Sequence, residues 1–184
     1  TVTTNATAEV KLIAANAEKV YDGTALTKTD GVTWEGLPAG FTVEATSTGS
    51  QTDAGSSANV VNDGYVIKDG NGVDQTASFT NVTKVPGTLK VTKAPVTITT
   101  GSDSKEYDGS PLTNDEADIT GLVNGETATV TATGSQTDVG SSTNTYSIDW
   151  GTTDSNNYAI TETLGTLTVT TNATAEVKLI AANA

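Results

Sequence analysis

The chain has 184 residues, nine lysines, no arginine and a formal net charge of −13, which argues against nucleic acids and anionic membrane surfaces as partners. It contains no Cys, His or Met, so disulfides, Cys/His metal centres and Cys- or His-dependent catalysis are excluded. Its 38 threonines and 18 glycines are typical of short strands joined by turns, and no apolar run approaches the roughly 18 residues that span a bilayer.

The first 17 residues of the chain return as its last 17. Thr1–Ala17 and Thr168–Ala184 both read TVTTNATAEVKLIAANA, and the copies start 167 residues apart (168 minus 1). This spacing predicts a window from a longer tandem array, in which 1–9 is the tail of a preceding module and linker. Residues 174–184 would be a linker and the first strand of a following module. A stretch added twice as a tag is the alternative interpretation.

Two diverged copies of one module lie between these ends. VYDGTALT at Val20–Thr27 returns as EYDGSPLT at Glu106–Thr113, and the two Tyr-Asp-Gly motifs are 86 residues apart (107 minus 21). TGSQTDAGSS at Thr48–Ser57 returns as TGSQTDVGSS at Thr133–Ser142. The matching order predicts two homologous units within the chain.

The strand pattern predicts an all-β fold built from two small sandwich modules. Apolar and polar residues alternate along Phe41–Ser47 and again along Gly87–Thr92, so one face of each strand should be buried. Strands are predicted near Val10, Val32, Phe41, Ala58 to Ile67, Thr76 and Thr88, with equivalents in the second copy. We expect β module 1 at 10–94 and β module 2 at 95–173, placed end to end as a semi-rigid rod because the links are short.

The Tyr-Asp-Gly motifs are predicted to be structural turns. Asp-Gly favours a tight turn because glycine tolerates a positive φ and aspartate can bond its own backbone. In each motif the Tyr ring should pack while its hydroxyl caps a neighbouring group. The residues concerned are Tyr21, Asp22, Gly23, Tyr107, Asp108 and Gly109.

One acidic loop is a candidate Ca²⁺ site. Asp69, Asn71 and Asp74 lie in KDGNGVD and offer hard oxygen ligands. Asp149, Asp154 and Asn156 offer a second such cluster in module 2. Neither stretch has EF-hand spacing, and ordinary acidic turns are the favoured interpretation; apart from Ca²⁺, no cofactor is expected.

The two tryptophans do not occupy equivalent positions. Trp34 aligns with Ile119 and is expected in the core, whereas Trp150 falls in a loop and is a candidate contact for a sugar ring. Exposed threonines suggest an ice-binding ladder only weakly, since ordinary strand propensity explains them.

Covalent cross-links and catalysis are both disfavoured. Lys11 alternates with apolar neighbours and should face solvent, so an isopeptide bond is not expected. Gln51 lies in mid-module and no His is present, which disfavours an ester cross-link. No nucleophile elbow, phosphate loop or metal-ligand set appears, and the chain is not expected to be an enzyme.

The ordered motifs resemble the YDG or MBG-type immunoglobulin-like repeats of bacterial cell-surface adhesins. YDGTALT, GLPAGFTVEATSTGSQTDAGSS, NYAI and GTLTVT carry the resemblance, which covers both modules. Module 1 departs from it by an inserted KDGNGVDQ and by Phe79, where module 2 has Tyr158. The resemblance implies immunoglobulin-like or β-grasp-like sandwich modules on the extracellular bacterial surface, anchored to the cell wall through regions outside this chain.

The expected function is a stalk or spacer repeat that projects a distal binding domain from the cell wall. The alternative is an adhesive module that binds mucin, glycan or matrix protein. Expected partners are neighbouring repeats, a host glycoprotein or glycan, and a second copy in a head-to-tail contact through 177–184, because an unpaired apolar strand invites pairing.

Overall fold

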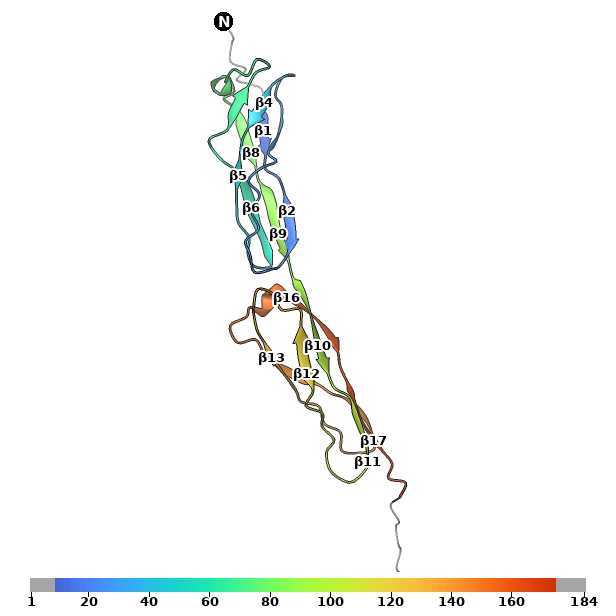
Figure 1. The fold of residues 1–184 in the computed structure, drawn as a ribbon. Helices are drawn as coiled ribbons and strands as arrows, with labels where there is room; N and C mark the ends of the chain where they lie inside the picture. Colours follow the sequence, from blue (N-terminus) through green and yellow to red (C-terminus); the bar gives the residue numbers. More distant parts are fainter. Residues whose placement is uncertain (1–8, 175–184) are drawn as a thin grey trace, which may run out of the picture. The chain divides into compact units, whose positions relative to one another are not determined.

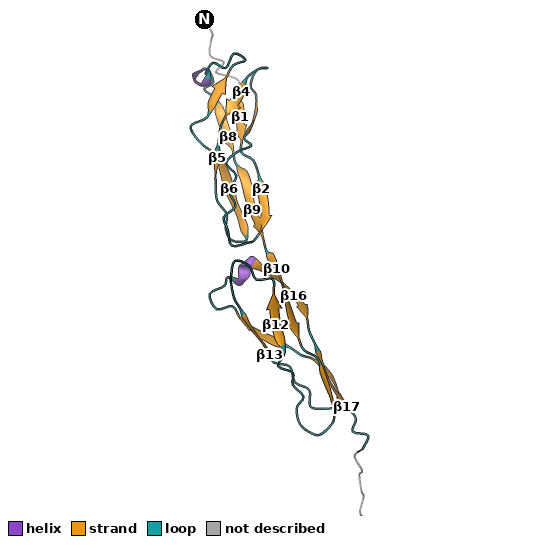
Figure 2. Ribbon diagram, viewed as in Figure 1, coloured by secondary structure: helices purple, strands orange, loops and turns teal. Residues whose placement is uncertain are grey.

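The computed structural model describes residues 9–174 (Figure 1). Within this range the regular structure is β-strand except for two short 3-10 helices, so the all-β expectation is confirmed (Figure 2). In the described part of the chain, no helix has the length and apolar character needed to cross a membrane. The described residues form two compact units: 9–94 with 156–158, and 95–155 with 159–174.

Three sheets make up the first unit. Their orders are β3-β1-β8, β2-β9-β6-β5 and β4-β7. The elements are β1 (Val10–Ile13), β2 (Ala17–Val20), β3 (Thr33–Glu35), β4 (Thr42–Glu44), β5 (Ser47–Thr48), β6 (Gly55–Val61), β7 (Val66–Lys68), η1 (Thr76–Ser78), β8 (Val82–Val85) and β9 (Gly87–Thr92).

The chain from β10 onward repeats this plan. Its sheets have the orders β12-β10-β16, β11-β17-β14 and β13-β15. The elements are β10 (Ala94–Thr100), β11 (Asp103–Glu106), β12 (Ala117–Thr120), β13 (Thr129–Ala132), β14 (Gly140–Thr143), β15 (Tyr146–Asp149), η2 (Ser155–Asn157), β16 (Tyr158–Thr163) and β17 (Thr166–Thr170).

In each unit, strands from the beginning of the fold pair in parallel with strands from its end. β1 runs parallel to β8 and β2 parallel to β9, whereas β6 joins β9 antiparallel. In the second unit β11 runs parallel to β17, which pairs antiparallel with β14 on its other side. Each last strand therefore lies between the first part of its unit and a middle strand.

The core is small and follows the predicted alternation. Along β9, Leu89 and Val91 are buried while Lys90 is exposed, and Leu167 and Val169 are buried in β17. The main cluster of the first unit contains Val10, Leu12, Ala14 and Val61, with partly buried neighbours that include Val43, Tyr65 and Phe79. The second unit has a cluster of Leu112, Leu167 and Val169.

Two strand predictions are wrong for local reasons. Thr76 begins the 3-10 helix η1, because its N–H and hydroxyl both donate to Asp74 Oδ1, at 2.9 and 2.7 Å, and hold a turn there. The stretch Ala58 to Ile67 is not one strand: β6 ends at Val61 and β7 starts at Val66.

Trp34 is not a core residue, contrary to the prediction. Its alignment with Ile119 is correct. Trp34 pairs with Leu12 of β1, and Ile119 pairs with Ile98 of β10, which is the strand equivalent to β1 in the second unit. However, β3 is an edge strand with all three residues exposed, and 37% of Trp34 remains accessible to solvent. Cross-strand position alone therefore does not ensure burial.

Candidate functional site

The first Tyr-Asp-Gly motif forms a turn directly after β2. Tyr21 N–H donates to Thr92 O at 2.8 Å and extends the pairing with β9. Asp22 Oδ1 accepts bonds from Lys19 Nζ at 2.6 Å, from Thr24 N–H at 2.9 Å and from Thr24 Oγ1 at 2.8 Å. Gly23 has a φ of 76°, a conformation that glycine adopts without strain. One carboxylate oxygen thus organises the turn.

The second motif repeats this geometry after β11. Asp108 Oδ1 accepts from Lys105 Nζ at 2.7 Å and from Ser110 N–H and Oγ at 2.9 and 2.7 Å. Gly109 has a φ of 79°. Sequence reasoning missed the lysine of the network, although a Lys stands two residues before each Tyr in KVYDG and KEYDG. That shared spacing was the available signal.

The lysines and turn donors lower the pKa of both aspartates. The pKa of Asp22 falls from 3.8 to about 2, chiefly through the Lys19 hydrogen bond and then through those of Thr24. The pKa of Asp108 is lowered by Lys105 and Ser110 in the same way. Both carboxylates are therefore ionised at neutral pH and occupied by donors from their own turn, an arrangement suited to structure rather than to proton transfer.

The expectation that each Tyr ring packs does not hold for Tyr107. Tyr21 is 5% exposed, whereas 41% of Tyr107 is accessible. The backbone of Tyr107 is nevertheless held like that of Tyr21, because its N–H donates to Thr170 O at 2.9 Å. The backbone bond to the last strand and the aspartate side chain therefore hold each turn in place, whether or not the tyrosine ring is buried.

Each unit also contains a fully buried asparagine, a feature that sequence reasoning missed. Asn59 Nδ2 lies within 3.0 Å of Ala15 O, Lys28 O and Ser47 Oγ. Asn144 Nδ2 donates to Gly101 O and Asn114 O, each at 2.9 Å. The two asparagines follow SSA and SST after the repeated TGSQTD segment, which is the sequence signal for their equivalence.

The acidic loop uses its carboxylates to close turns. Asp69 Oδ1 accepts from the N–H groups of Asn71 and Val73 at 2.9 and 3.0 Å, and these bonds lower the pKa of Asp69. Asp74 Oδ1 caps Thr76. Across residues 9–174, no group of three or more acidic side chains has an arrangement that could hold a metal ion.

The aromatic candidates are distributed differently from the prediction. Trp150 is only half-buried and its carbonyl accepts from Thr153 N–H at 2.8 Å, within the turn after β15. Trp34, expected inside, is the more accessible of the two. The two indoles thus lie on non-equivalent elements and do not form a repeated aromatic site.

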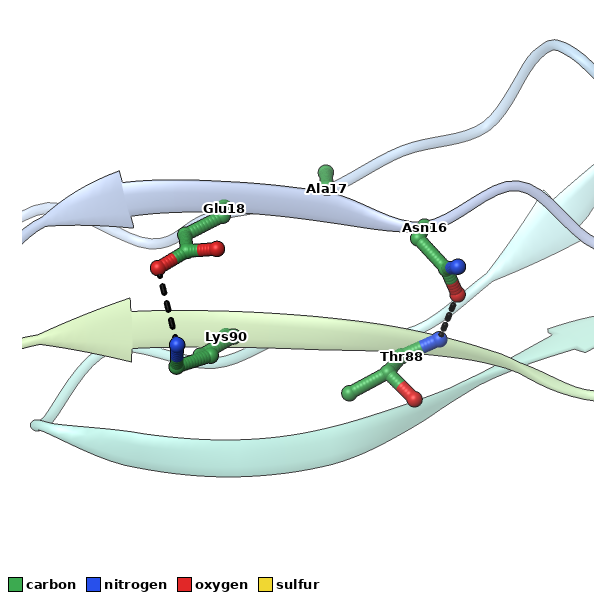
Figure 3. Close-up of a pocket in the computed structure, with 5 residues that line it drawn as sticks. All are labelled: Asn16, Ala17, Glu18, Thr88 and Lys90. Carbon is green, nitrogen blue, oxygen red and sulfur yellow. Dashed lines mark hydrogen bonds and ion pairs between the residues drawn. The ribbon is translucent and has the colours of Figure 1, made fainter.

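A shallow depression lies over the β2–β9 pair (Figure 3). Asn16 Oδ1 accepts from Thr88 N–H at 2.7 Å, and Glu18 Oε1 contacts Lys90 Nζ at 2.9 Å. These polar groups connect two strands of the unit across the surface. They are therefore already occupied by one another.

One comparison with known proteins matches part of the chain to a domain family. No curated protein gave a significant match to the chain. Residues 96–168, less than half of the chain, match the family model described as MBG domain (YGX type). This match agrees with the predicted resemblance to MBG-type domains and lies within the second copy of the module.

Proposed function

We propose that the chain is a spacer: two successive modules of immunoglobulin-like or β-grasp-like design in the stalk of a bacterial surface adhesin. One observation carries this proposal. The chain enters the first unit at Val10, beside Val82, and leaves it after Thr92, beside Val20. Because these strands are parallel, the entrance and exit lie at opposite ends of the ladder.

The ladder sets how far one unit advances the chain. Residues 82–92 run through β8 and β9 in one direction, and 11 extended residues at about 3.3 Å each span about 36 Å. A fold whose two chain ends lay at the same end of the strands would not lengthen a stalk. A unit that separates its ends is suited to holding a distal domain away from a cell wall.

The surface charge supports the same role. A net charge of −13 makes neighbouring copies of the chain repel one another. The proposed location is the extracellular bacterial surface, with wall anchoring through regions outside this chain. Neighbouring repeats are the proposed partners; a head-to-tail contact through 177–184 concerns residues outside the described range. The proposed role is non-enzymatic and requires no cofactor.

The second candidate is an adhesive module, favoured by the accessible indole of Trp34 on an edge strand. Such a ring can stack on a sugar. Binding of the full chain to immobilised mucins, glycans and matrix proteins, with and without Ca²⁺, separates the two functions. The spacer predicts no saturable binding. Saturable binding that Trp34→Ala or Trp150→Ala abolishes, while the matched variant Tyr107→Ala retains it, would establish the adhesive module instead.

The span of the unit is tested separately. The chain has no cysteine, so Glu9→Cys and Lys93→Cys place two dyes at exposed positions beside the ends of the first unit. Energy transfer should report a separation of about 35 Å, the length of the ladder. A separation of about half that value would contradict the spacer geometry.

A further inference from the structure

The paired first and last strands of the first unit point to a mechanical role. We infer that β1 and β2, held in parallel against β8 and β9, form a shear clamp that resists extension when the two ends of the unit are pulled apart. This inference rests on the proposed spacer function, since a stalk that holds a tip under load transmits force through its modules.

The clamp has one continuous register. Val10 pairs with Val82 and Ala17 pairs with Leu89, so both parallel ladders have an offset of 72 residues (82 minus 10, 89 minus 17). Backbone bonds extend each ladder at its ends, including Val10 N–H to Asn81 O at 2.9 Å and Tyr21 N–H to Thr92 O at 2.8 Å. The pairing therefore covers most of residues 10–21.

A side chain bridges the gap between the two ladders. Pro86 lies at this gap and has no N–H to donate. Two residues later, Thr88 N–H donates to Asn16 Oδ1 at 2.7 Å, and Glu18 and Lys90 form an ion pair across the same strands (Figure 3). The side chain of Asn16 thus supplies the acceptor for Thr88 N–H and links the two strands beside this gap.

Burial protects the clamp from competing water. Val10, Leu12 and Leu89 are 0% exposed and Val91 is 2% exposed. On its other side, β9 is held by β6 through residues 55–59. If β1 and β2 slid along β8 and β9, these side chains would become exposed at the same time as the hydrogen bonds between the strands broke. The barrier to unfolding under force therefore combines hydrogen bonds with apolar burial.

The direction of load decides the resistance. Force applied at Glu9 and Lys93 acts along parallel strands that point the same way, and it loads the ladder bonds at the same time. Force applied at Glu9 and Asn81 acts across neighbouring ends of β1 and β8, and it opens the bonds one after another. The same fold should therefore be strong in one direction and weak in the other.

The second unit has the same arrangement. β11 and β17 are parallel with an offset of 64 residues, Asp103 with Leu167. Here too a side chain supports the junction before the last strand, because Thr166 N–H donates to Ser102 Oγ at 2.9 Å. Tyr107 N–H extends this ladder to Thr170 O. Two diverged sequences thus retain a bridged parallel pair.

Single-molecule pulling on the full chain tests the inference. Two double-cysteine variants share Glu9→Cys and differ in the second handle, Lys93→Cys or Asn81→Cys, all at exposed positions. The first unit should unfold at a several-fold higher force when pulled through 9 and 93 than through 9 and 81. Equal forces, or a lower force for the 9/93 pair, would overturn the clamp.

Side-chain variants test the bridge itself. Asn16→Ala should lower the 9/93 unfolding force measurably. Asn62→Ala should leave that force unchanged, because it deletes a bond of the same 2.7 Å length, to Thr46 Oγ1, that lies outside the first and last strands. Circular dichroism confirms that both variants fold. An unchanged force for Asn16→Ala would overturn the assignment of Asn16 to the clamp.

The clamp and the spacer can fail separately. A weak 9/93 unfolding event in a unit whose dyes report the expected span would refute the clamp and leave the spacer intact. Saturable binding to a host ligand by a chain that shows the predicted directional strength would refute the spacer and leave the clamp intact.

Discussion

Replacement of the buried asparagine of the second unit should destabilise that unit strongly. Asn144 is fully buried, and its side chain bonds Gly101 O and Asn114 O at 2.9 Å and accepts from Gly134 N–H at 3.2 Å. These partners come from three segments that are far apart in sequence. The asparagine therefore adds side-chain bonds between these segments, beside the backbone bonds from Gly101 N–H to Glu116 O and from Thr133 N–H to Thr145 O.

The magnitude follows from the bonds that are lost. Asn144→Ala leaves two carbonyls and one N–H without their side-chain partner, and each bond contributes about 1 kcal/mol net. The expected loss is about 3 kcal/mol in the free energy of unfolding, a large part of the roughly 5 to 15 kcal/mol that a domain has. Asn172→Ala also deletes three side-chain hydrogen bonds, to Tyr107 O and from Thr174 N–H and Oγ1. Because Asn172 is exposed, water replaces these bonds, and the variant should cost only about 0.5 kcal/mol.

The two tryptophans provide the assay, since the chain has one on each side of the boundary at residue 94. In a Trp34→Phe background, urea unfolding followed by Trp150 fluorescence reports on the second unit. In a Trp150→Phe background, Trp34 reports in the same way on Asn59→Ala. Asn59 shares two N–H groups among three acceptors, and its Oδ1 has no hydrogen-bond partner, so about 2 kcal/mol is expected there.

The reasoning would be refuted if Asn144→Ala lost less than about 1 kcal/mol, the net value of one bond. Such a result would mean that water or a shifted backbone replaces the asparagine without cost. A loss equal to that of Asn172→Ala would lead to the same conclusion.

Three further predictions concern the strands and the turns. Gly165→Ala should lower the free energy of unfolding by about 3 kcal/mol, because the added Cβ would collide with Gly101 O and Thr100 O. In the control Gly109→Ala the Cβ meets no atom within 4 Å, so only the positive φ opposes it, at about 1 kcal/mol. Urea unfolding measures both losses. Leu167→Ala, at a position with 0% exposure, should cost about 3 kcal/mol in the same assay. Lys19→Met should raise the pKa of Asp22 from about 2 towards 3.8, as carboxyl NMR titration will show. Because the folded pKa is the lower one, the stabilisation exists above about pH 4 and is lost as the pH falls towards 2. The variant should show a smaller acid-dependent loss, since the two Thr24 bonds to Asp22 remain, and an unchanged pKa would contradict the role of the lysine.

The local pattern of the sequence was sufficient to predict the strands with one buried face. The alternation along Phe41–Ser47 and in GTLKVT describes the observed burial, since side-chain direction in a strand depends only on residue parity. Parity does not specify the neighbouring strand. The parallel pairing of β2 with β9, over a separation of 72 residues, therefore has no signature in local periodicity.

The missed polar contacts have a different cause. Asn59 and Asn144 lie in stretches that favour turns or exposed strands, and only the fold brings the carbonyls of distant loops within reach. Thr76 has high strand propensity, but the Asp74 cap outweighs it over three residues. In both cases a specific hydrogen bond overrides an average tendency of the residue type.

The comparison of the two copies within the chain favours the spacer over the adhesive module. Both copies retain the groups that set backbone geometry: the lysine–aspartate turn, the buried asparagine and a side-chain bridge to the last strand. The groups that a ligand would meet differ, since Trp34 and Trp150 lie on non-equivalent elements. A repeated adhesive site requires the same exposed side chains in each copy, whereas a repeated spacer requires only the same separation of its ends. A surface that differs between the copies, together with a parallel first and last strand in both, is therefore the pattern that the proposed spacer predicts.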